Sequence, residues 1–150
     1  MGRAILGVVV GLVVAFVIVF ALEAISHQIY PPPAGFDPSN PEAVRDLASR
    51  LPAGAFAFVL AGWVLGAALG AWAAVRVSGR MALWPGLVVG VLVLAASGYN
   101  VWTIPHPGWF ITVGLLGVAL GTWLGARTAY GGGAAGPTTS SDVSGSAAPR

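Results

Sequence analysis

Four long apolar stretches constrain most strongly how this chain can fold. They cover approximately residues 4–25, 53–75, 81–99 and 109–126. Each has about the 20 residues that an α-helix needs to cross a ~30 Å hydrocarbon core. Because backbone polar groups in lipid must be bonded within the protein, helices are the expected form of such segments. We therefore predict an all-α membrane protein with four transmembrane helices within residues 1–130.

The composition agrees with residence in a bilayer and excludes several other classes. Of 150 residues, 57% are hydrophobic and 8% are charged, and the mean hydropathy is +0.84. Such a chain has too little polar surface for a soluble globule. It has no cysteine, which excludes disulfides and thiol catalysis, and its formal charge of +2 predicts no nucleic-acid partner. No cofactor motif is present, so we predict the lipid bilayer as partner and no cofactor.

Two segments of the chain, residues 66–76 and 117–127, resemble each other. Glycine, leucine, tryptophan and arginine recur in them at the same spacing. A second register pairs Gly7 and Gly11 with Gly86 and Gly90, and His27 with His106. We predict two repeated helical hairpins, related by a pseudo-twofold axis along the membrane normal as in parallel-repeat transporters. The alternative is that small residues recur because they suit any helix interface.

Glycines four residues apart share one helix face, and two spans carry such a face. These glycines are Gly62, Gly66 and Gly70 in the second span, and Gly117, Gly121 and Gly125 in the fourth. Small residues allow helix backbones in lipid to approach closely. We predict that both faces pack against other helices. The sequence leaves open whether those helices belong to the same chain, to a second copy or to a larger membrane complex.

The connection over residues 26–52 is the longest between spans. Prolines from Pro31 onward cannot continue a helix. Asn40 is a good N-cap and is followed by Pro41 at the first helical position. Apolar residues then recur at helical spacing, which predicts a short amphipathic helix on the membrane surface or on the bundle. A plain solvated connector is the alternative.

The Gly/Ser-rich segment 131–150 is predicted to be a disordered cytoplasmic tail.

The basic residues indicate the orientation in the membrane. With the N-terminus inside, the cytoplasmic side carries Arg3, Arg76, Arg80 and Arg127. The opposite side receives two arginines that neighbouring acidic residues dilute. Because arginine-rich connections stay in the cytoplasm, we predict a multi-pass protein of the bacterial inner membrane with both termini cytoplasmic.

One candidate polar cluster lies near the outer ends of the spans. Glu23 and His27 are four apart and project from one helix face, while Asn100 and His106 lie at a similar predicted depth. Glu23, His27 and His106 together could ligate zinc, but they lack a short-spaced ligand motif. We therefore predict no metal and no catalytic residue. A structural role is favoured for Glu23, such as a hydrogen bond with His27 or a tie between helices to Asn100 or Tyr99.

Three sequence features together resemble a known type of protein. They are Glu-x3-His-x2-Tyr-Pro-Pro-Pro from Glu23, the loop from Asp37 to Pro52, and Pro-His-Pro-x-Trp-Phe from Pro105. The combination is similar to a family of small, uncharacterised four-span bacterial inner-membrane proteins, over about residues 4–127. The resemblance implies location and architecture, and no activity.

Two classes of function remain. The favoured one is a structural or accessory membrane protein that packs against itself or a larger complex. The alternative is a small transporter or channel, but the spans lack the intramembrane ionisable residues that usually mark an ion path. A membrane enzyme using Glu23, His27 and His106 ranks third, so the chain is expected not to be an enzyme.

Overall fold

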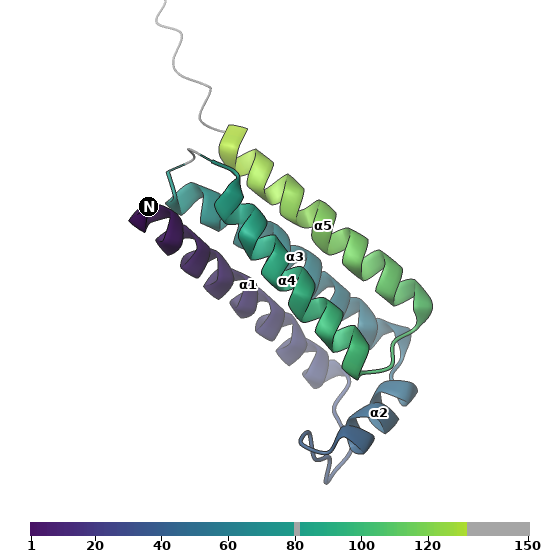
Figure 1. Ribbon diagram of the computed structural model, residues 1–150. Helices are drawn as coiled ribbons and strands as arrows, with labels where there is room; N and C mark the ends of the chain where they lie inside the picture. The colour runs from purple at the N-terminus through teal and green to yellow at the C-terminus, as the bar shows by residue number, and fades with distance from the viewer. Residues whose placement is uncertain (80–81, 132–150) are drawn as a thin grey trace, which may run out of the picture.

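The computed structural model describes residues 1–79 and 82–131, and the described chain is all-helical. Its helices, shown in Figure 1, are α1 (Gly2–Ile29), α2 (Pro41–Arg50), α3 (Ala53–Val77), α4 (Trp84–Thr103) and α5 (Gly108–Gly131). Four of them are long and apolar enough to cross a membrane. This confirms the predicted fold class. Arg80 and the predicted tail from residue 132 onward lie outside the described residues.

The spans differ from their predicted limits because prolines set several helix ends. α1 continues to Ile29 and stops before the proline run, where the Tyr30 N–H still donates to the Ser26 carbonyl at 2.7 Å. α4 begins at Trp84 rather than residue 81, with Pro85 in its first turn, where no amide donor is needed. It ends at Thr103, because Ile104 is held extended by the proline that follows it.

The connection between α1 and α3 contains the predicted short helix, α2. The Asn40 side chain accepts hydrogen bonds from the N–H groups of Glu42 at 2.9 Å and Ala43 at 3.4 Å. Ala48 on its apolar face is buried, and Arg50 pairs with Asp46 at 2.8 Å on the exposed face. Figure 1 shows α2 beyond the end of the bundle, and it packs against none of the other described helices.

The four long helices form a bundle with α3 and α4 between α1 and α5. Both α3 and α4 contact all of the other long helices, whereas α1 and α5 do not pack against each other. Figure 1 shows α1 and α5 on opposite sides. We call one end of the bundle the arginine end, because Arg3, Arg76 and Arg127 lie there. The opposite end, with residues 30–52 and 104–107, is the loop end.

This arrangement contradicts the predicted pseudo-twofold axis. Such an axis would exchange α1 with α4 and α3 with α5, so the contact of α3 with α4 would need a matching contact of α5 with α1. The described α1 and α5 make no such contact. The physical reason lies in the glycine faces of α3 and α5, which pack against different neighbours.

The glycine face of α3 packs against α1 at backbone distance. A Cβ added to Gly70 would lie 2.7 Å from the Gly11 carbonyl oxygen, and one added to Gly66 would lie 3.0 Å from the Ala15 carbonyl oxygen. A Cβ on Gly62 would have ordinary contact with Val19, at 3.5 Å. Glycine is thus required where the α1 and α3 backbones touch, and the face joins helices within the chain.

The glycine face of α5 packs against α3 instead of its hairpin partner α4. A Cβ on Gly121 would lie 2.9 Å from the Val64 carbonyl oxygen, and one on Gly125 would overlap the Ala68 backbone. Gly117 likewise faces the Val64 side chain. α4 packs beside these glycine faces. Its Gly86 lies against Ala71 of α3. In the same way, Gly90 of α4 lies against Thr122 of α5.

Candidate functional site

His106 lies in the short connection between α4 and α5 at the loop end. Its Nδ1 is 2.7 Å from the carbonyl oxygen of Ile104. Because a carbonyl oxygen can only accept, Nδ1 is the protonated nitrogen in this contact. The extended backbone of Ile104, imposed by Pro105, places this carbonyl within reach of the imidazole.

The His106 ring packs among three aromatic side chains, which with it we call the His106 cluster. It stacks on Phe110 of α5, with ring centroids 4.7 Å apart and planes 15° apart. Phe56 and Trp63 of α3 approach the imidazole at 5.7 and 6.3 Å between centroids. All three aromatic neighbours are buried. The cluster therefore ties the α4–α5 connection to the core between α3 and α5.

The His106 cluster is only partly visible in the amino-acid sequence. His106 and Phe110 are four residues apart, and Phe56 and Trp63 are seven apart, so each pair can share one face. Nothing local, however, relates α3 to the start of α5. That relation depends on the close packing of α5 on α3.

The other candidate polar residues have different surroundings. Glu23 is partly buried and His27 is exposed, both on α1, while Asn100 is partly buried on α4. Within the described residues, no side-chain hydrogen bond joins Glu23, His27, Asn100 and His106 to one another. In the same part of the chain, no three histidine or carboxylate side chains are grouped closely enough to hold a metal ion. Glu23 and His27 lie one helical turn apart on α1.

At the arginine end, the repeated tryptophan and arginine residues form matching pairs. The Arg76 guanidinium carbon lies over the Trp72 ring, 4.8 Å from its centroid. Arg127 lies over Trp123 at 5.1 Å. Each pair is four residues apart on one helix, and such cation–π contacts are worth roughly 0.5 to 1 kcal/mol at exposed sites. The two repeats therefore present the same basic and aromatic group at one end of the bundle.

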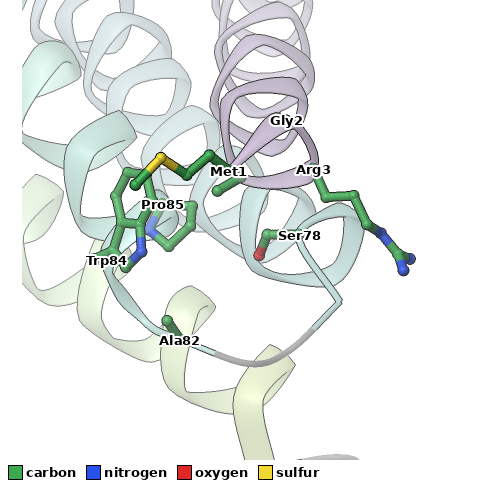
Figure 2. Close-up of a pocket in the computed structure, with 8 residues that line it drawn as sticks. Met1, Gly2, Arg3, Ser78, Ala82, Trp84 and Pro85 are labelled. Atoms are coloured by element: carbon green, nitrogen blue, oxygen red, sulfur yellow. The ribbon is translucent and has the colours of Figure 1, made fainter.

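A cavity of about 450 Å³ also opens at the arginine end, between the start of α1, the end of α3 and the start of α4. Figure 2 shows Met1 alongside Trp84 and Pro85, and the Arg3 guanidinium pointing away from these side chains. The Ser78 hydroxyl donates to the Val75 carbonyl at 2.9 Å. The described walls of the cavity are therefore mainly apolar.

Comparison with known proteins adds no relative. The chain matches no protein-family model, no curated protein and no solved structure. The resemblance to small four-span bacterial proteins rests on sequence motifs and stays a prediction.

Proposed function

We propose that this chain is a structural or accessory integral membrane protein that acts by packing against itself or a larger membrane complex. One observation carries the proposal, namely that helix backbones fill the interior of the bundle. A Cβ on Gly11 would lie 2.6 Å from the Gly70 carbonyl oxygen and 2.9 Å from Val89 Cγ2. α1, α3 and α4 therefore meet without room for a methyl group. A solute path would need space in this same region.

The buried polar side chains favour this proposal over the transporter or channel alternative. In the described part of the chain they are Ser26, Ser97 and Thr122, all uncharged hydroxyls. The Thr122 hydroxyl donates to the Val118 carbonyl at 2.7 Å, so its hydrogen is already used within α5. Ion and proton paths are usually lined by ionisable side chains paired across the bundle.

A partner would contact the outward faces of the helices, because the glycine faces are occupied within the chain. Val13 of α1, Val91 of α4 and Leu120 of α5 are each more than half exposed, at 56%, 64% and 58%. These three positions sample three faces of the bundle. They are suitable sites for probes because no described helix covers them.

The test places a photo-crosslinking residue at Val13, Val91 or Leu120 and irradiates intact membranes. The proposal expects one face to crosslink to a protein, either a second copy or another membrane component, while the other faces crosslink to lipid. Crosslinking to lipid alone at all three positions, together with ion or solute flux in liposomes, would overturn it in favour of a transporter.

The proposal also places the chain in the bacterial inner membrane with both termini cytoplasmic. Its support is the gathering of Arg3, Arg76 and Arg127 at one end. A reporter that is active only in the cytoplasm should function after Arg127, and one that is active only outside should function near Ser39. The opposite activities would reverse the orientation.

A further inference from the structure

A shallow groove runs between α3 and α5 toward the arginine end. Its volume is about 320 Å³. The lining residues are Ala68, Leu69, Trp72, Leu124, Gly125 and Thr128. The Thr128 hydroxyl donates to the Leu124 and Gly125 carbonyls at 2.8 and 3.1 Å, so its hydrogen bond stays within its own helix. The groove therefore offers an apolar surface to its occupant.

A cation stands at the arginine end of this groove. Ala68 and Trp72 line the groove. Arg76 is not a lining residue, but it follows Trp72 by one helical turn on the same face of α3. The Trp72 ring holds the guanidinium, 4.8 Å from the ring centroid. An apolar groove with a guanidinium held near one end matches the shape and charge of an acyl chain that is joined to a phosphate.

The charge distribution selects an anionic occupant. The carboxylates of the described residues, namely Glu23, Asp37, Glu42 and Asp46, belong to the last turns of α1 or to residues 30–52, toward the loop end. Within the same residues the ion pair is that of Asp46 with Arg50. Among these residues, the described carboxylates lie away from Arg76, and the nearest aromatic partner of its guanidinium is Trp72. Guanidinium N–H groups fit phosphate oxygens in a bidentate manner, and tryptophan favours the headgroup region.

We propose that the groove between α3 and α5 binds one anionic phospholipid of the leaflet at the arginine end. One acyl chain lies along Ala68, Leu69 and Leu124, and the headgroup phosphate binds Arg76. This site is independent of the proposed structural function, because it needs no protein partner.

The chain offers a matched control for this site. Arg127 on Trp123 repeats the same cation–π pair at 5.1 Å, but Trp123 does not line the groove, whereas Trp72 does. A general attraction of arginines to an anionic membrane would involve both pairs equally. A built site would depend on Arg76 and not on Arg127.

The experiment titrates the purified full chain in mild detergent with phosphatidylglycerol or with phosphatidylcholine carrying the same acyl chains. Native mass spectrometry measures the bound lipid. We expect Arg76→Gln to weaken phosphatidylglycerol binding roughly five-fold, as one arginine near an anionic headgroup implies. Arg127→Gln should leave that binding unchanged. Equal losses in both variants, or equal wild-type affinity for the two lipids, would overturn the proposal.

A second variant tests the acyl-chain part of the site without changing charge. Leu124 lines the groove and is 46% exposed, so Leu124→Trp can fill the groove without entering the core. It should weaken binding of both lipids. Unchanged lipid binding would overturn the proposal, and so would a dimer that dissociates in this variant while lipid binding persists, because a second copy would then occupy the groove.

Discussion

Helices α3 and α5 share a glycine spacing and a Trp–Arg pair, but their glycine faces pack against different neighbours. Gly66 and Gly70 of α3 contact the antiparallel helix α1. The equivalent Gly117 and Gly121 of α5 contact the parallel helix α3. The Trp–Arg pairs, in contrast, have nearly the same geometry, at 4.8 and 5.1 Å.

This difference separates contacts within one helix from contacts between helices. A pair four residues apart is set by the helix itself, so equal spacing gives equal pairs. A helix face can meet any neighbour that approaches closely enough, so equal spacing need not give equal packing. Position 74 illustrates this, because α3 carries Ala74 where the repeat register places Gly125 in α5. A Cβ at Gly125 would overlap the Ala68 backbone, whereas Ala74 is buried with its Cβ in place.

The largest expected effect is at the contact of α1 with α3. Gly70→Leu places a branched side chain where even a Cβ would lie 2.7 Å from the Gly11 carbonyl oxygen. We expect a loss of at least roughly 3 kcal/mol in unfolding free energy, since the helices must separate. Its control is Leu69→Ala, which alters a 46% exposed side chain and should cost under about 0.5 kcal/mol. Titration with a denaturing detergent would compare the two, and equal stability would mean that this face is turned to lipid.

A smaller change probes the contact of α5 with α3. Gly125→Ala should destabilise the protein by roughly 1 to 3 kcal/mol, because the added methyl meets the Ala68 backbone. Gly114→Ala, in the same helix, adds a methyl that has ordinary van der Waals contact with the Leu60 side chain, at 3.5 Å. It should be neutral, or stabilising by up to about 1 kcal/mol through helix propensity. Thermal unfolding in lipid nanodiscs can rank the two variants. The reverse order would contradict the packing of α5 on α3 at Gly125.

The two histidines that the repeat register pairs should also differ. His106→Ala removes the stacking on Phe110 and the contact with the Ile104 carbonyl, and should cost roughly 1 to 2 kcal/mol. His27→Ala changes an exposed side chain and should have little effect. The same unfolding measurement applies to both. Similar losses at the two positions would indicate that His27 has a partner comparable to the His106 cluster.

The smallest effect concerns the long connection that only the first half of the chain has. The Ser39 hydroxyl and N–H donate to Asp37 Oδ1 at 2.6 and 2.9 Å and lower the pKa of this carboxyl. Because the folded-state pKa of Asp37 is lowered, its ionised carboxylate stabilises the turn at pH values above the ordinary aspartate pKa. This stabilisation is lost as the pH falls through the folded-state pKa. An NMR titration should find the Asp37 midpoint below its usual range, and Ser39→Ala should raise it. An unshifted midpoint in the wild type would contradict these hydrogen bonds.

The sequence alone was sufficient for features that depend on neighbours along the chain. Asn40 and Pro41 correctly predicted the start of α2, because a cap needs only the next few residues. The four apolar stretches correctly predicted four helices of membrane-spanning length. Helix ends were less accurate at Ile29 and Trp84, where side-chain hydropathy changes gradually and prolines decide the limit.

The tertiary structure decided which helix each face meets. In lipid, burial of apolar surface from water does not distinguish one helix pair from another, so backbone approach and loop length select the partners. That is why the repeat predicted equal helices but not the placement of α5 against α3, and why His106 could not be joined to Phe56 and Trp63 from its motif. The sequence determined the helices and their small-residue faces because these are local properties. Only the packed bundle determined the His106 cluster and the groove between α3 and α5, because both require residues from separate helices.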